Sequence, residues 1–104
     1  MAVIYEWDVE ELEAPDTGDN DPEILDHNHC GSYAEAKSIA AELEGCGFYR
    51  IVLIRDVGNN LEGLTDRAWA YLKPNGTLPT TFTYGADEDS GILVPKRYHA
   101  EVAR

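Results

Sequence analysis

Four consecutive aliphatic residues, Ile51 to Ile54, are flanked by basic residues at Arg50 and Arg55. Successive side chains of a β-strand point to opposite faces, so an unbroken apolar run buries both faces of the strand at its middle. An edge or half-exposed strand would instead alternate apolar with polar residues. We therefore predict a central strand over Phe48–Asp56. The two arginines either cap the core and pair with acids of neighbouring strands, which is the favoured interpretation, or one of them anchors a partner.

The N-terminal segment Ala2–Glu10 alternates between an apolar face and a mostly acidic face, which predicts a strand. The apolar face consists of Val3, Tyr5, Trp7 and Val9, and the other of Ile4, Glu6, Asp8 and Glu10. We expect the first face to pack on the core and the second to be exposed to solvent. Glu23–Cys30 is a weaker strand pattern, which we expect to pair antiparallel with the first segment.

Two further strand regions follow the central strand. Arg67–Lys73 alternates between an aromatic face and a face of smaller apolar residues, and a ten-residue loop over 57–66 is expected to precede it. The segments Thr80–Tyr84 and Ile92–Val94 have the composition of a short hairpin.

One helix is predicted over Ser32–Glu44. Ser32 is a good N-cap, and Glu35 three residues later completes the pattern of a reciprocal capping box. Glycines at positions 45 and 47 end the helix. Its inner stripe consists of Ala36, Ile39, Ala40 and Leu43. A short terminal helix is expected to begin at Pro95.

Consecutive strands without alternating helices predict an α+β fold. The expected architecture is a mainly antiparallel sheet of four to six strands in ββαββ order, with one helix packed on one face and a short C-terminal helix. The length of 104 residues suits a single domain over residues 1–104, in which residues 14–22 form a mobile acidic loop. The two cysteines bracket the predicted helix, too far apart for a disulfide. Free thiols and the absence of a signal-peptide pattern make a cytoplasmic protein the expectation, without membrane binding.

The formal charge of −12 is concentrated in the first third of the chain, where eleven acids precede the first base, Lys37. Direct nucleic-acid binding is not expected, because it requires a cationic surface. The acids are either a solvated surface that keeps the protein in solution or a face that binds a basic partner. The preferred hypothesis is a non-catalytic protein-binding module that engages a basic protein surface. A specific form is an inhibitor or immunity-type protein that mimics nucleic-acid charge. The candidate binding acids are Glu6, Asp8, Glu10, Glu11, Glu13, Asp16, Asp19 and Asp21.

Trp69 and Tyr71 share one face of their predicted strand. They either pack in the core or form an exposed contact patch, since tryptophan and tyrosine are enriched at interface hot spots. Such a patch would bind a protein partner or a second copy of the chain, so a homodimer is compatible with the main hypothesis.

His27 and His29 lie two residues apart on a predicted strand, so their imidazoles project to the same face, while Asp26 and Cys30 point to the other. A divalent metal ion would need a third ligand, from His99 or from a carboxylate. The alternative function is therefore a small metal-binding protein or metal-dependent enzyme. The competing interpretation is that both histidines are exposed or hydrogen-bonded beside acids. No cofactor is otherwise indicated, and no nucleophile elbow points to an enzyme.

Overall fold

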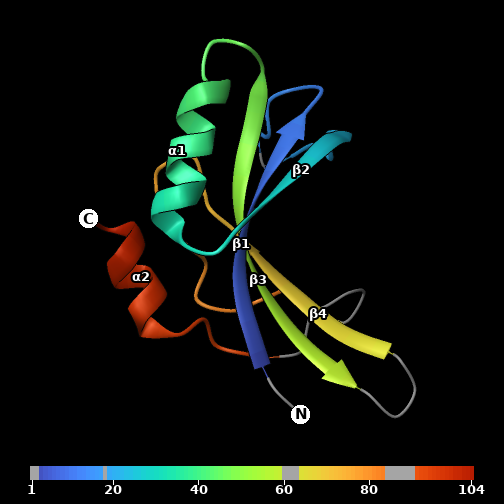
Figure 1. Ribbon diagram of the computed structural model, residues 1–104, viewed down its shortest axis with the longest axis vertical. Helices are drawn as coiled ribbons and strands as arrows, with labels where there is room; N and C mark the ends of the chain where they lie inside the picture. The colour runs from blue at the N-terminus through green and yellow to red at the C-terminus, as the bar shows by residue number, and fades with distance from the viewer. Residues whose placement is uncertain (1–2, 18, 60–63, 84–90) are drawn as a thin grey trace. The chain divides into compact units, whose positions relative to one another are not determined.

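The protein is built on a four-stranded antiparallel sheet with the strand order β2-β1-β3-β4 (Figure 1). The computed structural model describes residues 3–17, 19–59, 64–83 and 91–104. The elements are β1 (Val3–Leu12), β2 (Ile24–Cys30), α1 (Tyr33–Leu43), β3 (Phe48–Asn59), β4 (Leu64–Tyr71) and α2 (Lys96–Val102). The predicted α+β fold, with ββαββ order and a short C-terminal helix, is confirmed.

Strand β3 occupies the inner position that its apolar run predicts. Its four aliphatic residues, Ile51 to Ile54, are all buried, and β1 and β4 flank the strand. The strand continues three residues beyond the predicted end at Asp56, and β4 begins at Leu64. The predicted ten-residue loop is therefore partly strand, while residues 60–63 lie outside the described chain.

Strand β1 departs from its simple two-faced pattern. Trp7 and Val9 are buried as predicted, whereas Val3 at the start of the same face is 43% exposed. The expectation of a solvent-exposed acidic face is wrong at Asp8 and Glu10, which are 2% and 6% exposed. The physical reason is that β1 is an inner strand, and side chains from its neighbours cover these carboxylates and neutralise part of their charge.

Helix α1 begins and ends as the sequence predicts. The Ser32 hydroxyl accepts a hydrogen bond from the Glu35 amide at 3.2 Å, and the Glu35 carboxylate accepts one from the Gly31 amide at 3.0 Å. The Glu35 carboxylate thus bonds to the amide of the residue before the N-cap, whereas in a capping box it bonds to the amide of the N-cap residue itself. Gly45 has a φ of 87°, the left-handed conformation in which glycine ends a helix.

The inner face of α1 packs against β2. Ala36 and Ala40 are buried, which confirms the centre of the predicted stripe. Tyr33 in the first turn is also buried, with its ring centroid 5.0 Å from that of Trp7 on β1. The small alanines and this aromatic pair fix the helix close to its strands.

The C-terminal part of the chain returns along β4 and ends in α2. Backbone hydrogen bonds join Phe82 to Ile92 and Val94 to Thr80, so these segments pair as isolated bridges. The rest of the predicted hairpin, residues 84–90, lies outside the described chain. In α2, Tyr98 contacts Tyr5 of β1 with 5.3 Å between ring centroids.

The chain divides into two compact units. We call Trp7–Val52 the acidic unit and Met1–Glu6 with Leu53–Arg104 the C-terminal unit. Strands β1 and β3 each contribute residues to both. The prediction of a single domain over residues 1–104 stays a prediction. Neither described helix is long and apolar enough to cross a membrane.

Candidate functional site

Four potential ligand side chains lie on one face of the β1–β2 pair in the acidic unit. The antiparallel register places Asp8 opposite His29 and Glu10 opposite His27. Directly opposed residues of an antiparallel pair project to the same face, and so do residues two apart on one strand. Two carboxylates and two imidazoles are thereby collected into a two-by-two arrangement.

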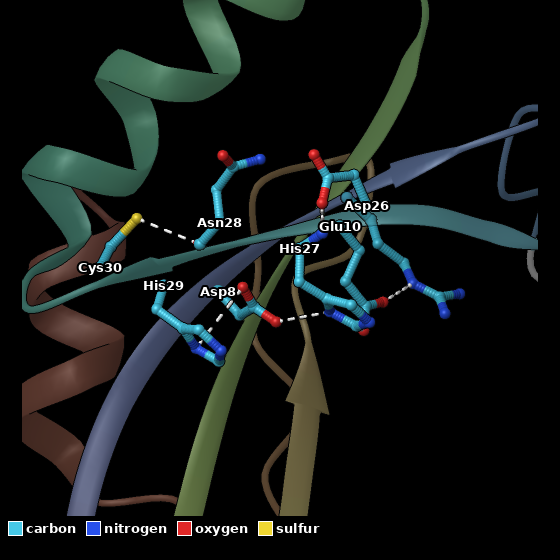
Figure 2. Close-up of polar contacts among 8 residues, drawn as sticks. Asp8, Glu10, Asp26, His27, Asn28, His29 and Cys30 are labelled. Atoms are coloured by element: carbon cyan, nitrogen blue, oxygen red, sulfur yellow. Dashed lines mark hydrogen bonds and ion pairs between the residues drawn. The ribbon is translucent and has the colours of Figure 1, made fainter.

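The diagonal pair of this arrangement makes the closest contact. His27 Nδ1 lies 2.9 Å from Asp8 Oδ2 and 3.9 Å from Glu10 Oε2. His29 Nδ1 lies 3.9 Å from the other carboxylate oxygen, Asp8 Oδ1. Figure 2 shows Asp8 between the two imidazoles. His27 is therefore the histidine that joins both acids of β1, and His29 is peripheral.

Burial changes steeply across this cluster. The Asp8 and Glu10 side chains are 2% and 8% exposed, whereas those of His27 and His29 are 50% and 64% exposed. A buried carboxylate retains its charge only if neighbouring donors or cations replace its hydration. Within the described chain, however, Asp8 Oδ1 is a buried oxygen without a hydrogen-bond partner. The cluster thus consists of two buried carboxylates and two imidazoles that are accessible to solvent.

Arg50 of β3 compensates the second acid. Its Nε donates to Glu10 Oε1 at 2.6 Å, and its Nη1 donates to Asp16 Oδ2 at 3.1 Å. The predicted pairing of Arg50 with neighbouring acids is confirmed. Because Arg50 occupies Oε1 of Glu10, Oε2 is the oxygen that faces His27.

Cys30 lies on β2 but takes no part in the cluster. Together with Asn28 it points to the opposite side of the strand from the histidines (Figure 2), and its thiol donates to the Asn28 carbonyl at 3.4 Å. Burial raises the pKa of the Cys30 thiol, and the carboxylates of Glu35 and Asp8 raise it further. The thiol is therefore protonated at neutral pH and is a poor nucleophile. Cys30 and Cys46 are both free, as predicted.

The loop between β1 and β2, which we call the acidic hairpin, carries four exposed carboxylates. They belong to Glu13, Asp19, Asp21 and Glu23. The Glu13 amide donates to the Glu23 carbonyl at 3.0 Å and closes the base of the loop. Within the loop, the Asn20 side chain accepts from the Thr17 amide at 3.0 Å and donates to the Pro15 carbonyl at 2.8 Å.

The predicted binding acids therefore have different environments. Glu13, Asp19 and Asp21 are exposed, whereas Glu6, Glu11 and Asp16 are half-buried and Asp8 and Glu10 are buried. The buried pair belongs to the histidine cluster and is not presented on the surface. Of the predicted binding acids, the three that are exposed all lie on the hairpin.

The predicted aromatic patch lies in the C-terminal unit. Trp69 and Tyr71 are both half-buried, and their ring centroids are 6.5 Å apart. The Trp69 amide and carbonyl both bond to Thr83, at 3.0 and 2.8 Å. The backbone at Trp69 is therefore held by hydrogen bonds, while both residues are partly accessible to solvent.

The partnership of His27 with Asp8 and Glu10 was not predicted from the sequence. The sequence does contain a signal for it. Asp8 and Glu10 are two residues apart on one predicted strand, and His27 and His29 are two residues apart on the next. Only the register shows that these pairs face each other. Comparisons of the chain with models of protein families, with curated proteins and with solved structures give no match.

Proposed function

We propose that the protein is a non-catalytic binding module whose acidic hairpin engages a basic surface of another protein. The observation that supports this proposal is the exposure of four carboxylates on one closed hairpin. The unit that carries the hairpin has twelve acids and two bases, a formal charge of −10. A partner with positive charge is therefore attracted to this unit from a distance.

The physical consequence concerns the rate of association more than the strength of the final contact. Complementary charge raises association rates, and salt reduces the effect because the screening length is about 8 Å at physiological ionic strength. Exposed charge pairs individually contribute little free energy. We therefore expect fast, salt-sensitive binding through the acidic unit. Trp69 and Tyr71 of the C-terminal unit are a separate candidate contact, for a protein partner or for a second copy of the chain.

The test uses the full chain as bait in an extract of its native host, at about 50 mM and 1 M NaCl, with captured proteins identified by mass spectrometry. The key variant removes the four hairpin charges with little change in shape, as E13Q/D19N/D21N/E23Q. A charge-preserving control, D19E/D21E, alters the same loop. We expect a partner that binds the natural chain and the control at low salt and is lost from the neutralised variant. The proposal fails if a specific partner binds all three chains equally or is undiminished in 1 M NaCl.

The nucleic-acid-mimic form of the hypothesis adds one competition experiment. If the partner's basic surface normally holds nucleic acid, increasing concentrations of duplex DNA should displace increasing amounts of the protein from the partner. A partner that binds the protein and DNA simultaneously would exclude mimicry while leaving the protein-binding function intact.

A further inference from the structure

We propose that Asp8, Glu10 and His27 form a binding site for one divalent transition-metal ion of the zinc class. The three residues offer two carboxylate oxygens and one imidazole nitrogen, and these atoms all lie within 4.8 Å of one another. The site lies in the acidic unit, and none of its three residues belongs to the acidic hairpin.

The distances suit a shared ion. Zinc bonds to histidine nitrogen and carboxylate oxygen at about 2.0–2.2 Å, so two ligand atoms of one ion lie no more than about 4.4 Å apart. His27 Nδ1 lies 2.9 Å from the Asp8 oxygen and 3.9 Å from the Glu10 oxygen. All three ligand atoms lie within 4.8 Å of one another, so an ion bonded to all of them would hold the Asp8 and Glu10 oxygens within about 4.4 Å.

The second, independent observation is the buried oxygen Asp8 Oδ1. Asp8 is 2% exposed, and within the described chain this atom has no hydrogen-bond partner. Leaving a buried polar atom unsatisfied costs about 1–3 kcal/mol, and more for a charged group. A bound cation beside the Asp8 carboxylate would compensate this charge.

The charge of the cluster also favours a divalent ion. Arg50 pairs with Glu10 Oε1 at 2.6 Å but shares its single positive charge with Asp16, at 3.1 Å. The carboxylates of Asp8, Glu10 and Asp16 therefore outnumber the one cation that pairs with them. The surrounding unit has a formal charge of −10, so its field attracts cations to the cluster.

The donor set selects the type of metal. Calcium and magnesium prefer oxygen ligands, whereas imidazole nitrogen favours zinc and other first-row transition metals. The imidazole of His27 is half exposed, so the ion would also be reached by water. The chain supplies three ligands, and solvent would complete the coordination.

The experiment titrates Zn²⁺ alone into chelator-treated full-length protein by isothermal calorimetry at low salt, with Ca²⁺ and Mg²⁺ as comparison ions. We expect one Zn²⁺ per chain and weaker binding of the other two ions. H27A and D8N should each weaken Zn²⁺ binding by about tenfold or more. Because the His27 side chain is half exposed, H27A should fold as the natural chain does, and circular dichroism checks both variants.

Three control variants separate the site from adventitious binding. H99A removes a histidine of the other unit, and D19N/D21N removes two hairpin charges, so both should retain the natural affinity. H29A should lose less affinity than H27A, because the His29 Nδ1 lies 3.9 Å from Asp8 Oδ1, whereas the His27 Nδ1 lies 2.9 Å from Asp8 Oδ2.

Nuclear magnetic resonance provides a second measurement, since stoichiometric Zn²⁺ should shift the His27 imidazole signals and leave those of His99 unchanged. Absence of Zn²⁺ binding up to millimolar concentration, or unchanged affinity in H27A, would overturn the proposal. Equal binding of Ca²⁺, or loss of Zn²⁺ binding in D19N/D21N, would do so as well, because either result would assign the ion to the acidic surface.

Discussion

The two units of the protein differ in how they use charge. The acidic unit has twelve acids and two bases, a formal charge of −10, whereas the C-terminal unit has eight acids and six bases, a formal charge of −2. Within the described chain, the buried charged residues Asp8 and Glu10 both belong to the acidic unit. The core of the C-terminal unit includes Leu53, Ala68 and Phe82.

This difference shows that the charge asymmetry of the sequence is not only a surface property. The acidic unit presents carboxylates to solvent on its hairpin and also encloses two beneath His27. The exposed ones are suited to attracting a partner at low cost in stability, because water screens them. The enclosed ones require compensation by Arg50, by imidazole and, as we propose, by a metal ion. Under the two proposals, one unit combines a surface that attracts a basic partner with a cluster that binds a metal ion.

The largest effect is expected from the two tryptophans, one in each unit. Trp7 is 2% exposed and packs on Tyr33, so W7A should lower the free energy of unfolding by about 3–5 kcal/mol. Trp69 is half-buried, so W69A should cost less than about 2 kcal/mol. Urea denaturation followed by circular dichroism measures both values. Equal losses would show that Trp69 is as much a core residue as Trp7 and would weaken its assignment to a contact patch.

The next effect contrasts the arginines of the two units. The Arg50 side chain is 9% exposed and pairs with Glu10 and Asp16, so R50A leaves a buried carboxylate uncompensated and should cost about 3 kcal/mol or more. The Arg67 side chain is 48% exposed and lies 3.6 Å from Asp56, so R67A should cost less than about 1 kcal/mol. The same denaturation series measures both. A small loss in R50A would mean that Glu10 reaches solvent in the folded protein once Arg50 is removed.

The smallest effect tests self-repulsion among the hairpin acids. D19N/D21N should raise stability by about 0.5 kcal/mol at low salt, because it removes two charges from a strongly negative unit. The gain in stability should be smaller in 1 M NaCl, because the salt already screens the repulsion that the substitutions remove. In the nearly neutral C-terminal unit, E101Q should give no such gain. Thermal unfolding at two salt concentrations measures these differences, and a salt-independent gain in D19N/D21N would attribute the effect to loop conformation.

Much of the fold was predictable because local patterns dominate it. The aliphatic run of β3 requires burial on both faces, and Ser32, Glu35 and Gly45 determine where α1 begins and ends. The strand β1 was predicted correctly, but the environment of its acidic face was not. Alternation shows which residues share a face, whereas burial depends on what neighbouring strands place over that face.

The sequence by itself determined the elements, the concentration of acids in the first third and the two pairs of ligand residues at a spacing of two. Only the tertiary structure decided that these pairs meet. The loop joining β1 to β2 spans eleven residues, and the register shifts between Glu11 and Leu12, so loop length does not fix which residues oppose each other. A slip of one residue would move both histidines to the other face of the sheet. The register that places His27 opposite Glu10 follows from packing of the whole sheet, and the candidate metal site exists only because of it.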